Sequence, residues 1–156
     1  MSSVNLWKQE YLLELDVIDD QHKHFFELCG NIIQIAENAT CDQESISLVI
    51  RALGGLRTYA FLHFKTEEDI MLKFGFPSYL QHTGYHNGYL QKMMQFESGF
   101  KALLTDLKKE GMENELLRTF LKDVAEFITD WWSVHIVEQD SKYAAHIREK
   151  RMSDLG

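Results

Sequence analysis

Four stretches of this chain carry apolar residues at a spacing of three or four, and this pattern constrains the fold more than any other feature. Such spacing places the apolar side chains on one face of an α-helix. The stretches cover about residues 19–38, 43–73, 78–110 and 114–135. The single proline, Pro77, stands in one of the short connections, so no helix interior bears its cost of about 3 kcal/mol. The pattern predicts an all-α protein with an up-down-up-down four-helix bundle.

The expected four-helix domain runs over residues 19–148, from a helix opened by Asp19 to a short C-terminal helix that ends near Arg148. Residues 1–18 have no helical period and are expected to form an N-terminal arm along the domain. Residues 149–156 are expected to form a frayed tail.

Several residues mark the expected helix ends. Thr40 followed by Gln43 resembles a capping box for the second helix. Gly75 suits the end of that helix, and Gly111 is expected to end the third. Asn114 is expected to cap the fourth helix. In the arm, Trp7 and Tyr11 are the expected anchors on the bundle.

Composition narrows the class of protein. A net charge of −8 argues against nucleic-acid binding, which depends on clustered Lys and Arg. The first residues lack a basic segment followed by an apolar run, and no uncharged apolar stretch is long enough to span a membrane. These features predict a cytoplasmic protein without a membrane span. Cys29 and Cys41 form no CxxC pair and are read as two buried thiols.

Polar residues interrupt the apolar face of every predicted helix. One histidine on such a face is more often a hydrogen-bonded core residue than a ligand. Burying many polar groups without compensation would cost several kcal/mol each for the acids, whereas a shared metal site would satisfy them together. The interrupting residues are His22, His63, Glu67, His82, His86, His135 and Asp140.

The positions of these residues support a common site. In an antiparallel bundle, all of them fall at the same end. His63/Glu67 and His82/His86 have i,i+4 spacing, which puts each pair on one helix face. His135 and Asp140 are five residues apart, about 140° off in a regular helix. For Asp140 to be a ligand, the helix must be irregular over residues 136–140.

The ordered set resembles the hemerythrin family, particularly its single-domain bacterial members. The motifs are Asp-x-Gln-His ending at His22, HxxxE over 63–67, HxxxH over 82–86 and HxxxxD over 135–140. Further matching features are Trp7, Glu68, Met71, Phe76-Pro77, Trp131 and Tyr143. The resemblance extends from about Trp7 to Tyr143. Each motif is weak alone, but the ordered set of seven ligand residues is specific.

The resemblance implies a non-haem centre with two iron ions. His82, His86 and His135 would complete one iron, and His22 and His63 would hold the other and leave a vacancy for dioxygen. Glu67 and Asp140 would bridge the irons, with an oxo or hydroxo group as third bridge.

The resemblance also implies a function, namely reversible dioxygen binding for storage, delivery or local supply, without enzymatic activity. The expected partners are dioxygen and an unidentified protein that receives it. A di-iron redox enzyme acting on nitric oxide or peroxide and an oxygen or redox sensor remain alternatives. A structural zinc site is the weakest reading, because seven ligands exceed what one tetrahedral zinc needs.

Two further groups of candidates surround the ligands. Trp132 stands three residues before His135, where the family commonly has Leu beside the vacant site; it would line the oxygen pocket or simply pack between helices. The other pocket candidates are Ile18, Phe25 and Phe26. Candidates for contacts behind the ligands are Asp19, Gln21 and Tyr143, with surface or capping roles as the alternative.

Overall fold

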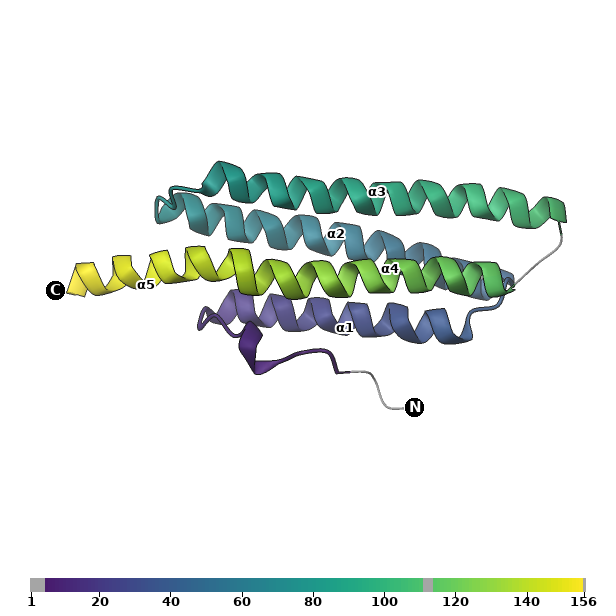
Figure 1. Ribbon diagram of the computed structural model, residues 1–156, viewed down its shortest axis with the longest axis horizontal. Helices are drawn as coiled ribbons and strands as arrows, with labels where there is room; N and C mark the ends of the chain where they lie inside the picture. Colours follow the sequence, from purple (N-terminus) through teal and green to yellow (C-terminus); the bar gives the residue numbers. More distant parts are fainter. Residues whose placement is uncertain (1–4, 111–113, 156) are drawn as a thin grey trace.

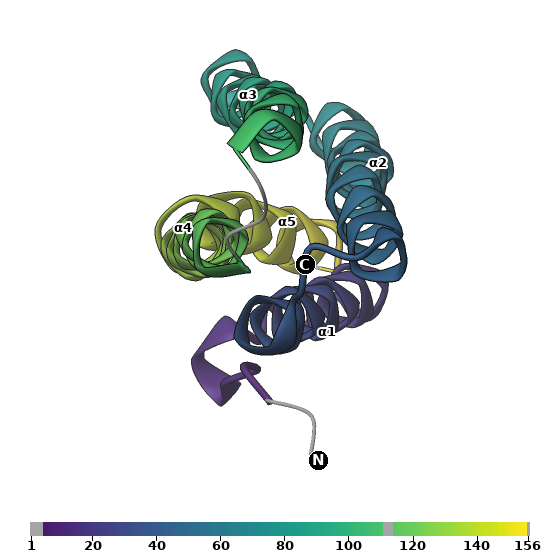
Figure 2. The same cartoon turned by 90° about the vertical axis from the view of Figure 1, so that its right-hand side faces the viewer.

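The computed structural model describes residues 5–110 and 114–155 as an antiparallel four-helix bundle with an N-terminal arm (Figures 1 and 2). The elements in chain order are η1 (Gln9–Tyr11), α1 (Asp16–Asn38), α2 (Gln43–Lys73), α3 (Tyr79–Glu110), α4 (Asn114–His135), η2 (Ile136–Asp140) and α5 (Ser141–Leu155). The all-α, up-down-up-down prediction is confirmed. The expected end of the third helix at Gly111 lies outside the described residues. Over the described ranges, no helix has the length and apolar character needed to cross a membrane.

The connection between α1 and α2 is capped differently from the prediction. Asp42, not Thr40, is the N-cap of α2, and its Oδ1 accepts a hydrogen bond from the Ser45 backbone N–H at 2.7 Å. The Thr40 hydroxyl donates to Asp42 Oδ2 at 2.6 Å and so holds the cap in place. An aspartate is the better cap because its charge also complements the helix dipole. The Asn114 side chain at the start of α4 accepts a bond from the Cys41 N–H at 2.9 Å and ties this connection to α4.

At the opposite end, Gly75 lies between α2 and α3 with a φ of +63°. This left-handed backbone favours glycine, as expected for a helix C-terminus. The connection is short, so α3 runs back alongside α2 (Figure 1).

The N-terminal arm packs on α1. The Tyr11 ring stacks on Phe26 at 4.8 Å, and Trp7 meets both rings edge-on. The arm is shorter than predicted, since α1 begins at Asp16 rather than Asp19. Asp19 lies one turn inside this helix. Its carboxylate accepts hydrogen bonds from the backbone of the arm, which stabilises the earlier start of α1.

The C-terminal helix is longer than predicted. α5 continues past Arg148 to Leu155, so residues 149–155 are helical rather than frayed. The segment has no Gly or Pro and contains strong helix formers. Its first turns are fastened to the bundle: Tyr143 and Ile147 pack on Met71, and His146 Nε2 donates to the Phe74 carbonyl at 2.8 Å.

The helix is irregular where the sequence requires it to be. Residues 136–140 form a π-helical turn, η2, between α4 and α5. A π turn needs about one residue more than an α turn, so residues five apart come onto one face. The predicted irregularity between His135 and Asp140 is thereby confirmed.

Candidate metal centre

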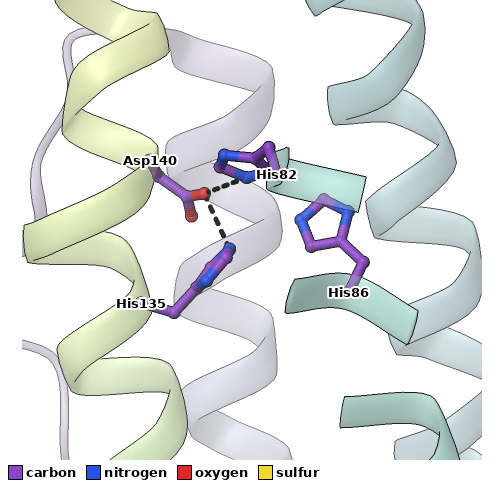
Figure 3. A group of neighbouring side chains, drawn as sticks. All are labelled: His82, His86, His135 and Asp140. Carbon is purple, nitrogen blue, oxygen red and sulfur yellow. Dashed lines mark ion pairs between the residues drawn. The ribbon is translucent and has the colours of Figure 1, made fainter. Parts of the chain in front are cut away.

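Two groups of buried ligand-type side chains lie at one end of the bundle. The first comprises His82, His86, His135 and Asp140, and the second comprises His22, His63 and Glu67. Within each group the ligand atoms lie within 4.8 Å of one another. All seven predicted ligand residues are thus brought together. Figure 3 shows the first group, with histidines from α3 and α4 converging on the Asp140 carboxylate.

Asp140 joins the two groups. Its Oδ1 lies 3.0 Å from Nε2 of both His82 and His135, as the dashed lines in Figure 3 mark. Its Oδ2 lies 3.2 Å from His22 Nε2, which belongs to the second group. One carboxylate therefore presents one oxygen to each group, and it can do so because η2 turns it inward.

Glu67 has the same position between the groups. Its Oε1 is 2.7 Å from His63 Nε2, one helical turn earlier on α2, and 3.7 Å from His86 Nε2 on α3. Its Oε2 accepts a hydrogen bond from the Tyr143 hydroxyl on α5. Both carboxylates are therefore shared between the two groups. Three of the histidines belong to the first group and two belong to the second.

Contacts behind the ligands orient the imidazoles. His63 Nδ1 lies 2.6 Å from Gln21 Oε1, and His86 Nδ1 lies 2.8 Å from Glu68 Oε2. An acceptor at Nδ1 places the proton there and leaves Nε2 free as the ligand atom. Gln21 and Tyr143 are therefore found behind the ligands, as expected. Glu68 was not among the site candidates, although its place directly after the HxxxE motif was a signal for it.

Asp19 has a different contact. It is buried, and its Oδ1 and Oδ2 accept bonds from the backbone N–H groups of Leu13 at 2.8 Å and Leu15 at 3.2 Å. These bonds hold the arm against the start of α1. Glu14 between them has a φ of +61°, a left-handed conformation that costs a non-glycine residue roughly 1–2 kcal/mol.

Unpaired polar atoms show that the residues fit a metal. Nε2 of all five histidines, Glu67 Oε1 and both Asp140 oxygens are buried and make no hydrogen bond with the described residues. Buried polar groups in proteins are ordinarily paired. Five imidazoles and two carboxylates whose converging atoms lack hydrogen bonds form a donor set suited to iron and related transition metals.

The electrostatics of the centre favour a bound cation. Burial lowers the pKa of His63 and lowers that of His86 to about 3, so both are neutral, as metal ligands must be. Burial also lowers the pKa of His135, but the nearby Asp140 carboxylate has the larger, opposite effect. The pKa of the His135 imidazole is therefore raised. Burial raises the pKa of the Asp140 carboxyl, whereas the neighbouring histidines lower it. The histidines have the larger effect, so the pKa lies well below its usual range. The ionised carboxylate therefore attracts a positive charge, which a metal would supply.

The pocket candidates separate in the structure. Trp132 is fully buried, with its ring 5.6 Å from that of His63 and 6.1 Å from that of His22. The Phe25 ring lies 3.8 Å from Trp132. Phe26 instead stacks under the arm on Tyr11. Ile18 lines a hollow between α1, α2 and α5, together with Leu15, Phe74 and Ile147.

Comparisons with known proteins agree with this geometry. The family model "Hemerythrin HHE cation binding domain" matches residues 13–147. Bacteriohemerythrin of Clostridium acetobutylicum is 25% identical over 138 residues, which cover 88% of this chain and 97% of that protein. Bacteriohemerythrin of Methylococcus capsulatus is 27% identical over 134 residues, covering 86% and 88%.

Solved structures confirm the fold. A wild-type hemerythrin structure superposes with a TM-score of 0.69 at 24% identity, covering 89% of this chain and 94% of that chain. A hemerythrin mutant gives 0.70 at 24% identity, covering 90% and 94%. Together with the matched family model and the buried His and carboxylate clusters, these findings support a non-haem iron protein, and the chain belongs to the hemerythrin family.

Proposed function

We propose that this protein binds dioxygen reversibly at a non-haem di-iron centre. The observation that carries the proposal is the pair of shared carboxylates: Asp140 presents one oxygen to each group of histidines, and Glu67 Oε1 lies between His63 and His86. Two ferrous irons held by the seven residues would supply the electrons and the open coordination position that dioxygen needs.

The asymmetry of the donor set supports a dioxygen position on one of the two metals. His82, His86 and His135 serve one metal, whereas His22 and His63 serve the other, so the second has one protein donor fewer. The Trp132 ring packs beside that second side, Phe25 packs on Trp132, and both side chains are fully buried. A dry apolar wall suits a neutral diatomic ligand and opposes the escape of charged products.

The ligand chemistry supports binding over turnover. Five neutral imidazoles and two carboxylates make a less anionic set than the Glu-rich centres of carboxylate di-iron proteins. Fewer anionic donors stabilise high-valent iron less well, which favours release of oxygen over its activation. The expected physiological role is storage, delivery or local supply of oxygen.

The test is a visible absorption spectrum of iron-loaded, anaerobically reduced protein before oxygen, after oxygen and after purging. The proposal predicts a colourless protein that gains a visible charge-transfer band with oxygen and loses it on purging. Immediate conversion to a stable ferric form would favour a redox enzyme or sensor instead. Failure to bind two irons per chain would overturn the di-iron assignment itself.

Replacing Trp132 tests the pocket directly. Trp132→Leu opens space beside His22 and His63, so we expect faster oxygen exchange and faster autoxidation, followed by stopped-flow absorption. Trp7→Leu removes a tryptophan from the arm and is the matched control, for which no change is expected. Unchanged kinetics in Trp132→Leu at normal iron content would assign Trp132 to helix packing alone.

A further inference from the structure

A chain of indole rings connects the metal centre with the surface. Trp132 is its inner end, fully buried, with its ring 5.6 Å from His63 and 6.1 Å from His22. Its ring also lies 5.2 Å from that of Trp131, the preceding residue on α4. Electron transfer slows exponentially with the distance between two rings, so neighbouring indoles that are nearly in contact exchange electrons readily.

Trp131 is the outer end. It lines an open groove of about 410 Å³ between α3 and α4, together with Tyr85, Phe127, Val134 and Gln139 among others. Its ring stacks on that of His135, with centroids 4.3 Å apart and an interplanar angle of 14°. Trp131 therefore touches one candidate metal ligand and a solvent-facing groove at the same time.

A third aromatic residue is close but is chemically unsuited to carry charge. The Tyr89 ring lies 4.7 Å from Trp131 and 5.4 Å from Trp132. Its hydroxyl is buried and has no hydrogen-bond acceptor among the described residues. Oxidation of a phenol at ordinary potentials requires its proton to leave, and here nothing can accept it. Charge on the indoles therefore does not pass to Tyr89.

We propose that Trp132 and Trp131 form an electron relay that carries oxidising equivalents from the metal centre to the groove between α3 and α4. The inference rests on the proposed iron centre but not on reversible oxygen binding. Its function would be to protect a protein that handles oxygen from hydrogen peroxide, which one-electron side reactions of oxygen produce.

The electron balance is complete with a diffusible reductant. Hydrogen peroxide reduced at the centre takes two electrons and two protons and leaves as two waters. If bound irons were already ferric, each electron would come from Trp132, which Trp131 would re-reduce, or from Trp131 directly through His135. Oxidised Trp131 releases its indole N–H proton to water in the groove. A reductant such as ascorbate or a thiol then restores its electron, and the proton returns from water or the reductant.

The test maps oxidation on the whole chain with iron bound. Air-oxidised, iron-loaded protein is treated with a small excess of hydrogen peroxide without reductant, digested, and analysed by mass spectrometry. Frozen samples are examined by electron paramagnetic resonance for a tryptophan radical. We expect oxygen addition at Trp131 and none at Trp7, the remaining tryptophan, which packs in the arm. Ascorbate added with the peroxide should abolish the product.

Variants distinguish oxidation that arrives through the relay from oxidation that depends only on solvent exposure of the tryptophan. Trp132→Phe, compared at equal iron content, should lower the oxidation at Trp131, because only the route through His135 remains, whereas Trp7→Phe should not change it. Trp131→Phe keeps an aromatic ring on His135 and should shift the product to Trp132. Equal oxidation of Trp7 and Trp131, or the same pattern in metal-free protein, would mean attack from solution and overturn the relay. Full oxidation of Trp131 in Trp132→Phe would mean that electrons pass through His135 alone and would overturn the part assigned to Trp132.

Discussion

At the residue scale, the centre depends on side chains that touch the ligand residues from behind. Glu68 shows this most clearly. Its Oε2 lies 2.8 Å from His86 Nδ1, and burial raises the pKa of its carboxyl. A partly buried carboxylate behind an imidazole fixes the ring orientation and increases its basicity toward a metal.

We therefore expect Glu68→Ala to weaken iron binding about 10- to 100-fold, the usual effect of losing such a partner. Competition with a chelator of known affinity measures the change. Asp69→Ala is the matched control, since Asp69 is exposed and pairs with Lys65 at 3.6 Å. Equal affinities for the two variants would show that Glu68 does not support His86.

At the element scale, the π turn η2 is the feature on which the site depends most. His135 ends α4 and Asp140 ends η2, and both must face the same cavity. Ser141 then resumes a regular helix, so the irregularity is confined to the segment between two ligands. In a regular α-helix with the same spacing of five residues, Asp140 would lie about 140° around the helix axis from His135.

Deleting Val137, whose side chain is 43% exposed, tests this account. The deletion leaves the histidine and the carboxylate four residues apart, a spacing that brings both onto one face of a regular α-helix. We therefore expect a helical protein that binds iron without the π turn, as judged by circular dichroism and iron analysis. Val137→Ala keeps the chain length and the π turn and should bind iron normally as well. Loss of iron from the deletion at unchanged helicity would show that the π turn does more than direct Asp140 toward the other ligands.

The arm is a second element held by one residue. Asp19 accepts bonds from the Leu13 and Leu15 backbone and is itself buried. Asp19→Ala leaves these N–H groups unpaired, at a cost of about 1–3 kcal/mol for a buried donor. Chemical denaturation of Asp19→Ala against Asp20→Ala, an exposed neighbour, measures this difference. No difference between the variants would show that the arm is held by its aromatic contacts alone.

At the scale of the whole molecule, burying so many titratable groups makes stability depend on pH. In the metal-free protein the pKa of His86 is lowered to about 3. Between that pH and about 6.5, His86 is therefore protonated in the unfolded chain but neutral in the folded chain. Folding stability is then lost as pH falls below about 6.5, and His86 alone contributes a loss of about 2 kcal/mol at pH 5. His63 and Asp140, whose pKa values are also lowered, act in the same direction. His135 acts in the opposite direction, since its pKa is raised.

Denaturation of metal-free protein at pH 7 and pH 5 checks this balance. We expect lower stability at pH 5 than at pH 7. The difference between the two pH values should be smaller in His86→Leu, because leucine does not bind a proton in either state. A protein equally stable at both values would show that the raised pKa of His135 offsets the other groups.

The bundle and the choice of ligand residues were largely predictable from the sequence. Helical periodicity is a local property, so the four apolar faces and the residues that interrupt them can be read along the chain. Even the irregularity before Asp140 followed from counting, because a spacing of five cannot converge in a regular helix. The ordered motifs also pointed to the hemerythrin family, which the matched family model confirms.

Other features were decided by tertiary contacts, which have no local signature. Asp19 was expected behind the ligands but holds the arm, because the Leu13 and Leu15 N–H groups lie within its reach. α5 extends to Leu155 because its start is fastened to α2. Periodicity along α4 assigned Trp131 and Trp132 to one helix, but only the packing of α4 among the other helices places one beside a groove and the other beside His22 and His63. Sequence spacing specifies which side chains share a helix face, whereas the distances between faces on different helices are set by the packing of the whole core.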